Sequence, residues 1–166
     1  MFQPGEVIIY SGHGVCRVKE IGHPSIRGAN PDKLYYKLAP VYEVGDIYIP
    51  VDSRIFMRPI ITKEEAEDLI CRLPEIKEKS YAIINSNMAQ ARNFYKSILE
   101  THDCAMLFEL LRGFHAKAKK GKRLGQVDIS YMKRTEELLY GELAAALDIP
   151  LTEVEDHIKR AIRGAG

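Results

Sequence analysis

Side chains that could act as metal ligands or nucleophiles are scattered along this sequence rather than grouped. His102 and Cys104 form a His-x-Cys pair, half of the four ligands that a structural zinc site needs, and the start of a helix explains the pair better. The other histidines have no neighbouring Ser, Cys or Asp in a nucleophile arrangement. There is no Cys-x-x-Cys pair and no glycine-rich loop for nucleotide phosphates. We therefore expect a protein that is not an enzyme and that needs no metal or cofactor.

Basic residues, in contrast, gather in one stretch of the chain, which we call the basic block. Residues 111–135 contain eight Lys or Arg and one acidic residue, a local charge of +7 in a chain whose net charge is +1. Such a block between acidic flanks is typical of a surface that faces phosphates. A solvated loop between helices would have the same composition, so both interpretations stay open. The basic residues are Arg112, Lys117, Lys119, Lys120, Lys122, Arg123, Lys133 and Arg134.

The overall composition is that of a globular protein with one mid-sized domain or two small ones. The chain has 166 residues, of which 46% are hydrophobic and 28% are charged. No apolar run approaches the roughly 20 residues of a membrane span. The first residues lack the basic start and apolar stretch of a signal peptide. Its 3 cysteines are far apart in the sequence, which fits a reducing compartment, so we expect a cytoplasmic protein.

The elements that must position these side chains change in type near residue 60. Residues 1–60 combine short β-rich runs with turn formers such as Ser11-Gly12-His13-Gly14, and this pattern predicts a small antiparallel barrel of the SH3 or Tudor type. An open barrel edge is either protected or used to recruit another strand. The predicted strands cover residues 6–10, 15–21, 34–39, 46–50 and 54–58.

Residues 61–166 carry a helical period instead, so the fold class is α+β with a barrel domain, 1–60, and an all-α bundle, 61–166. Thr62 with Glu65 and Thr152 with Glu155 have the spacing of capping boxes, which predict two helix starts. The predicted helices cover residues 62–73, 87–101, 103–120, 128–147 and 152–164.

Several segments together resemble the CarD/CdnL family of bacterial transcription regulators. In the barrel half these are the opening strand, the turn at residues 11–14, the loop Ser25-Ile26-Arg27-Gly28 and the strand Asp46-Ile47-Tyr48-Ile49-Pro50. The helical half agrees in order and length, including Gly141-Glu142-Leu143-Ala144. The resemblance implies that the barrel docks on the β subunit of bacterial RNA polymerase. It implies polymerase contacts at Ser25, Ile26, Arg27 and Tyr48.

The resemblance also implies that the helical domain contacts promoter DNA at the upstream edge of the melted −10 region. Many members insert a tryptophan wedge into the minor groove there, but this chain has no Trp, and Met88 stands at the matching position. Methionine can insert between base steps, although a methionine that fills a gap in the core is the alternative. Arg92 and Lys96 keep positive charge on the same helix. Well-known members have arginines where this chain has Pro24 and Tyr48, so Tyr48 is either an aromatic anchor or one wall of the barrel.

The combined prediction is a monomeric transcription regulator that binds RNA polymerase and stabilises the open promoter complex. Its expected DNA contacts are Met88, Arg92, Lys96 and the basic block, which would touch the backbone without reading bases. One alternative is a protein-interaction adaptor without DNA contact. Another is an RNA-binding barrel that uses Tyr35, Tyr36 and Tyr48 as a stacking platform.

Overall fold

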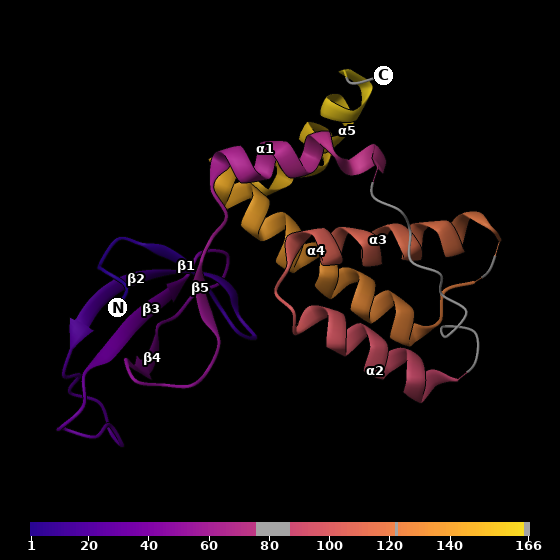
Figure 1. Ribbon diagram of the computed structural model, residues 1–166. Helices are drawn as coiled ribbons and strands as arrows, with labels where there is room; N and C mark the ends of the chain where they lie inside the picture. The colour runs from indigo at the N-terminus through magenta and orange to yellow at the C-terminus, as the bar shows by residue number, and fades with distance from the viewer. Residues whose placement is uncertain (76–86, 122, 165–166) are drawn as a thin grey trace. The chain divides into compact units, whose positions relative to one another are not determined.

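The chain folds into two compact units, which we call the sheet unit, Met1–Ile61, and the helical unit, Thr62–Gly166. The computed structural model describes residues 1–75, 87–121 and 123–164, and Figure 1 shows the two units. Each unit has its own core and is described by itself below. Among the described helices, none combines the length and the hydropathy that crossing a membrane would require.

The sheet unit is a five-stranded antiparallel sheet with the strand order β4-β3-β2-β1-β5. This confirms the predicted Tudor-like β domain in front of a helical domain. Strand β4 lies at one edge of the sheet and β5 at the other. The strands are β1 (Val7–Tyr10), β2 (Gly14–Gly22), β3 (Tyr35–Pro40), β4 (Ile47–Pro50) and β5 (Met57–Pro59).

The last strand begins later than the predicted range of 54–58. The hydroxyl of Ser53 accepts a hydrogen bond from the backbone N–H of Ile55 at 3.2 Å, so the chain turns here before it can pair with β1. The turn between β1 and β2 is as predicted, because Gly12 and Gly14 both adopt the positive φ that glycine takes without strain.

A β-bulge explains why the alternation of apolar and polar residues in β2 is imperfect. The pairing of β2 with β3 shifts between Val18 and Glu20, so that Lys19 is an extra residue on β2. Cys16 and Val18 lie in the core of the sheet unit, and the extra residue brings Ile21 to the same side. The core consists of Ile8, Tyr10, Cys16, Val18, Tyr36, Leu38 and Ile49.

The helical unit has five described α-helices, as the sequence predicted. Its core is lined by the apolar stripe of α3, including Leu107, Leu110 and Phe114, and by Leu139 and Leu143 of α4, all of which are buried. The helices are α1 (Lys63–Cys71), α2 (Met88–Leu99), α3 (Cys104–Lys119), α4 (Gln126–Leu147) and α5 (Val154–Gly164). Two 3-10 turns, η1 (Leu73–Glu75) and η3 (Leu151–Glu153), follow α1 and precede α5.

Local hydrogen bonds fix where most of these helices begin. Thr62 and Glu65 form the predicted capping box, with each side chain accepting from the other residue's backbone N–H at 3.1 and 3.0 Å. The carboxylate of Asp103 accepts from the N–H of Met106 at 3.2 Å and caps α3.

Two predicted helix starts are wrong. Thr152 lies inside η3, whose preceding residue is Pro150, so α5 follows a 3-10 turn instead of a Thr152 cap. Helix α4 begins at Gln126, two residues before Asp128. Asp128 is the third residue of this helix, and its carboxylate accepts a bond of 3.4 Å from the N–H of Gly125.

Candidate functional surfaces

The loop between β2 and β3 presents three exposed side chains in a row, Ser25, Ile26 and Arg27. A turn shapes it, because the N–H of Ala29 donates to the carbonyl of Ile26 at 3.3 Å and Gly28 between them has a φ of 89°. Ile26 is 41% exposed, although burying an isoleucine side chain is energetically favourable. The loop is therefore an apolar and basic projection at the end of the sheet.

Tyr48 lies on the edge strand β4, on the face of the sheet away from the core. Ile49 belongs to the core and Ile47 packs against it, so alternation turns the intervening Tyr48 outward. Tyr48 is half-buried and pairs in register with Lys37 of β3. The pKa of the Lys37 ammonium is raised, first by Tyr48 and to a smaller extent by the carboxylates of Glu20 and Asp46. Tyr48 thus forms part of an outer, polar surface next to a free strand edge.

The loop and Tyr48 belong to the same end of the sheet. Gly22, which precedes the loop, pairs with Tyr35, and Tyr35 pairs on its other side with Pro50 of β4. Tyr48 is two residues away from Pro50. The register thus places the loop with Ser25, Ile26 and Arg27 at the end of the sheet toward which β4 runs, two residues beyond Tyr48.

In the helical unit, three helix ends meet at one end of the bundle. Figure 1 shows the N-terminus of α2, the C-terminus of α3 and the N-terminus of α4 on this side, which we call the turn end. The arrangement follows from short connections, because α3 runs antiparallel to both neighbours and packs against them. Met88 is the first residue of α2 and is 62% exposed, which rules out the alternative of a methionine that fills the core.

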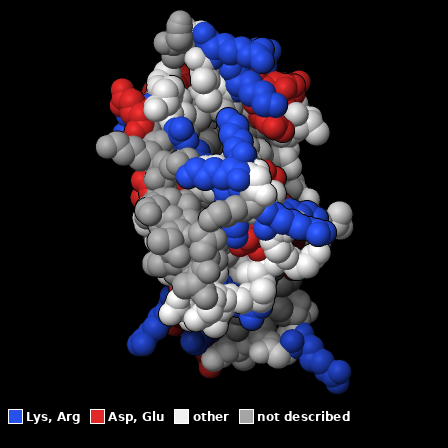
Figure 2. Space-filling model, turned by 90° about the vertical axis from the view of Figure 1, so that its right-hand side faces the viewer, with Lys and Arg blue, Asp and Glu red and all other residues white. Residues whose placement is uncertain are grey.

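Four exposed cations, which we call the turn-end cations, belong to the helices and the turn at this end. Arg92 on α2 is exposed, as are Lys119 at the end of α3 and Lys120 and Arg123 between α3 and α4. Within the described residues, none of these four forms an ion pair with a carboxylate. Figure 2 looks onto this side of the molecule and shows Lys and Arg side chains spread over it. Such cations are free to pair with phosphates.

Lys117 differs from its basic neighbours because it is used inside the protein. Its ammonium lies 2.7 Å from the carboxylate of Asp128, and the two side chains are only 14% and 9% exposed. The hydroxyl of Tyr95, which is fully buried, donates to the other oxygen of Asp128 at 2.5 Å. We call these three residues the internal triad, since it ties α2, α3 and α4 together.

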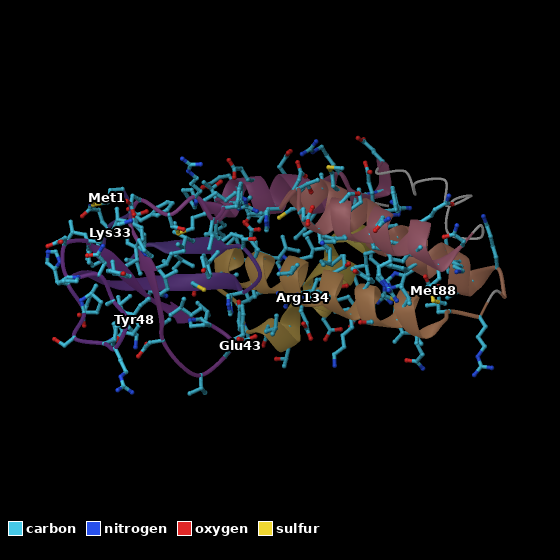
Figure 3. The ribbon with its side chains drawn as sticks, turned by 90° about the horizontal axis from the view of Figure 1, so that it is seen from below. Met1, Lys33, Glu43, Tyr48, Met88 and Arg134 are labelled. Atoms are coloured by element: carbon cyan, nitrogen blue, oxygen red, sulfur yellow. The ribbon has the colours of Figure 1, made fainter. Side chains whose placement is uncertain are left out.

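Two other basic candidates, unlike the turn-end cations, have a printed partner among the described residues. Arg112 donates to the backbone carbonyl of Leu73, and Arg134 lies 3.3 Å from Glu137. Figure 3 shows Met88 near one end of the helical unit and Arg134 closer to its middle.

Three basic candidates remain: two are exposed on the helices, and one lies outside the described residues. Lys96 lies 3.9 Å from the carboxylate of Glu100, a weak surface pair. Lys133 is exposed on α4. Lys122 lies outside the described residues.

Sequence reasoning missed Asp128 and Tyr95. Burial by itself would raise the pKa of Asp128, but the hydrogen bonds from Lys117 and Tyr95 and the charge of Lys117 lower it overall. The available signal was that Asp128 is the single acidic residue of the basic block, which marks it as a partner for one of those cations.

The His102–Cys104 pair does not form a metal site in the described part of the chain. The thiol of Cys104 is buried and donates to the carboxylate of Glu142 at 3.2 Å. No group of three or more potential ligands occurs among the described residues. The pair instead begins α3, where His102 precedes the capping residue Asp103.

Comparison with known families identifies the sheet unit. Residues 2–61 match the CarD-like/TRCF RID domain, which is the RNA polymerase-interacting domain of CarD-like proteins. The matched residues cover the whole five-stranded sheet. No curated protein matches the chain.

Proposed function

We propose that this chain, a transcription-related protein whose residues 2–61 form a CarD-like/TRCF RID domain that interacts with RNA polymerase, regulates transcription by stabilising the open promoter complex. In this proposal the sheet unit binds the β subunit of the polymerase and the helical unit binds promoter DNA. The single observation that carries the DNA half is the exposed Met88 at the same end of the bundle as the exposed turn-end cations.

On the polymerase side, the free edge of β4 supports docking by strand addition. Main-chain hydrogen bonds from an added strand would give affinity, and outward side chains would give selectivity. Tyr48 offers an amphipathic ring at this edge, and Ile26 with Arg27 offers an apolar and charged contact from the loop. Aromatic and Arg side chains are the residues that most often dominate interface energies.

On the DNA side, the side chains at the turn end divide into two roles. Arg92, Lys119, Lys120 and Arg123 contact phosphates and hold the unit on the duplex without reading sequence. Met88 inserts at the edge of the melted region, where unstacking a base step costs a few kcal/mol and bases are already separated. Lys117 has no part in this surface, because the internal triad uses its charge.

The mechanism depends on a difference in affinity between two promoter states. A regulator that binds the open complex more tightly than the closed one shifts the equilibrium by that difference and by nothing else. Binding through the polymerase raises the local concentration of the helical unit near the DNA to about the millimolar scale, so its own DNA affinity can be weak. Specific bases need not be read, and the polymerase supplies the choice of promoter.

The lifetime of the open complex tests the role of Met88. We expect Met88→Ala to shorten the lifetime and Met88→Trp to lengthen it, because indole presents a larger flat face to an unstacked base. Leu151→Ala is the matched control, since Leu151 is 39% exposed on η3, near the opposite end of α4. Equal lifetimes for the two Met88 variants and the unmodified protein would remove the wedge from the proposal.

Salt dependence separates DNA contact from the adaptor alternative. Log affinity falls with log salt, and each phosphate contact that is lost makes this negative slope less steep by about 0.9 for duplex DNA. Lys120→Glu combined with Arg123→Glu therefore weakens binding to a forked promoter fragment and flattens this slope. An adaptor would bind the fork weakly and equally with and without the two substitutions.

Docking on the polymerase is measured separately with the purified core enzyme. Tyr48→Ala and Arg27→Glu should each weaken the complex, and Tyr48→Ala by about tenfold or more if Tyr48 is a central anchor. Tyr42→Ala and Arg54→Glu serve as matched controls, since both residues are exposed in other loops of the sheet unit. Loss of binding in the controls alone would move the docking surface elsewhere.

A further inference from the structure

We propose that a groove of the helical unit binds an amphipathic helix whose apolar stripe is flanked by acidic residues. The groove has a volume of about 570 Å³ and is lined by residues of η1, α3, α4 and α5. Helices α3 and α5 both pack on α4, and the groove runs between them. It is distinct from Met88 and Arg92, which lie on α2 and do not line it.

The shape of the groove follows one face of α3. Its lining residues on this helix run from Phe108 to Lys119 with helical spacing, and eleven steps of about 1.5 Å make the face about 17 Å long. Residues of α5, including Ile158 and Ile162, form the facing wall at the same spacing. A channel three helical turns long between two helices suits a third helix better than a compact small molecule.

The floor of the groove is apolar and partly open to water. Phe108, Leu111 and Ile158 are buried within the core, so only their edges reach the groove. Ile162 is 41% exposed, although Val154 and Ile158 on the same helix are buried. An apolar stripe with residues at i, i+3, i+4 and i+7 would cover this surface and gain the free energy of its burial.

The rim of the groove fixes the charge of its occupant. Among the described residues that line it, four are cations, Arg112, Lys119, Lys120 and Lys159, and one is a carboxylate, that of Glu155. Glu155 lies 3.2 Å from Lys159 and so offsets one of them. Within the described residues Lys119 and Lys120 form no ion pair, so they are available to acidic side chains.

Tyr140 adds a neutral hydrogen-bond donor to the groove. Burial, together with the nearby carboxylates of Glu136 and Glu155, raises the pKa of its phenol to about 12. The hydroxyl therefore keeps its proton at physiological pH and can donate to a carboxylate or a carbonyl of the bound helix.

Lys119 and Lys120 belong both to this rim and to the proposed DNA surface. A helix in the groove would occupy these two side chains and compete with phosphates for them. Binding of an acidic helix is therefore expected to weaken DNA binding by the same factor by which DNA weakens helix binding. Only this competition rests on the proposed function, whereas the groove and its occupant do not.

The test uses the full chain and a labelled designed peptide of about 14 residues, or roughly four helical turns. The peptide carries Leu along one stripe and Glu on its other faces, and the control peptide replaces every Glu with Lys. We expect fluorescence anisotropy to report binding of the Glu peptide but not of the Lys peptide. The Ile162→Glu substitution should weaken binding of the Glu peptide about tenfold or more, since it places a charge against the apolar stripe of the peptide.

Two further variants separate this site from the DNA surface. Lys159→Glu should weaken the peptide several-fold, whereas Lys133→Glu, an equal charge change outside the groove lining, should leave it within twofold. Forked DNA should bind the Ile162→Glu protein within twofold of the unmodified protein. Equal binding of the Glu and Lys peptides, or no effect of Ile162→Glu, would overturn the proposal. A parallel loss of DNA binding in Ile162→Glu would instead assign the groove to DNA.

Discussion

The internal triad gives the sharpest test of how the basic block is divided, because Lys117 looks like its neighbours in sequence and differs from them in the fold. The perturbation is Lys117→Met, which keeps most of the aliphatic stem and removes the ammonium. Among the described residues it leaves the carboxylate of Asp128, 9% exposed, with the Tyr95 hydroxyl at 2.5 Å and the Gly125 N–H at 3.4 Å as partners. The matched control is Lys120→Met, at an exposed position three residues along the chain.

The expected loss follows from removing one partner of a buried ion pair. Such a change costs about 3–5 kcal/mol, and the slight exposure of both side chains points to the lower value, about 3 kcal/mol. The exposed control should stay within about 0.5 kcal/mol. With a urea dependence of about 2 kcal/mol/M, the midpoint of unfolding should fall by about 1.5 M for Lys117→Met and by less than about 0.3 M for Lys120→Met.

The assay is urea unfolding followed by circular dichroism at the helix band, which reports the helical unit because the other unit has a β-sheet fold. Combining Lys117→Met with Asp128→Asn should restore most of the loss, because the amide is neutral and still accepts a bond from Tyr95. Forked DNA should bind the folded Lys117→Met protein within twofold of the unmodified one. A stable Lys117→Met protein with impaired DNA binding would refute the reasoning and return Lys117 to the DNA surface.

The same structure supports three further predictions. Folding lowers the pKa of Asp128, so the stability that its carboxylate contributes is complete above the unfolded pKa of about 3.9 and is lost as the pH falls through the folded pKa. In Asp128→Asn the free energy of unfolding of the helical unit should therefore depend less on pH in the acid range. An unchanged pH dependence would contradict this. Thr62→Ala should lower the free energy of unfolding by about 1 kcal/mol through loss of the α1 cap, whereas the exposed Thr152→Ala should cost less than half of that, as thermal unfolding can check. A thiol reagent at pH 8 should modify the exposed Cys71 at once and the buried Cys16 only on unfolding. The reason is that burial, and to a smaller extent the charge of Glu43, raises the pKa of the Cys16 thiol to about 11. Rapid reaction of Cys16 in the folded protein would show that the core of the sheet unit opens.

Helices, strands and turns were predictable wherever the residues that determine them lie within a few positions of one another in the sequence. The Thr62–Glu65 box and the Asp103 cap depend on partners three residues apart, and the positive φ of the first turn's glycines needs no distant partner. Five strands followed by five helices came from the change in hydrophobic period, because the period directly reflects which face of each element is buried. The position of the basic block was likewise visible as soon as the charges were counted.

The roles of single residues in the candidate site needed contacts that span the chain. Lys117 and Tyr95 are 11 and 33 residues from Asp128, and nothing local says which cation of a block will be buried against a carboxylate. The extra residue Lys19, which redirects Ile21, appears only once β2 is paired with β3.

From the sequence alone came a β domain, a helical domain and a cluster of cations on either side of the turn between two predicted helices. Tertiary structure decided that one of those cations is internal, that Met88 lies exposed at the same end of the bundle as Lys119, Lys120 and Arg123, and that α3 and α5 leave a groove between them. The reason is physical: periodicity and caps express burial and hydrogen bonding along one element, whereas pairing of charges and the shape of a surface depend on which elements pack together.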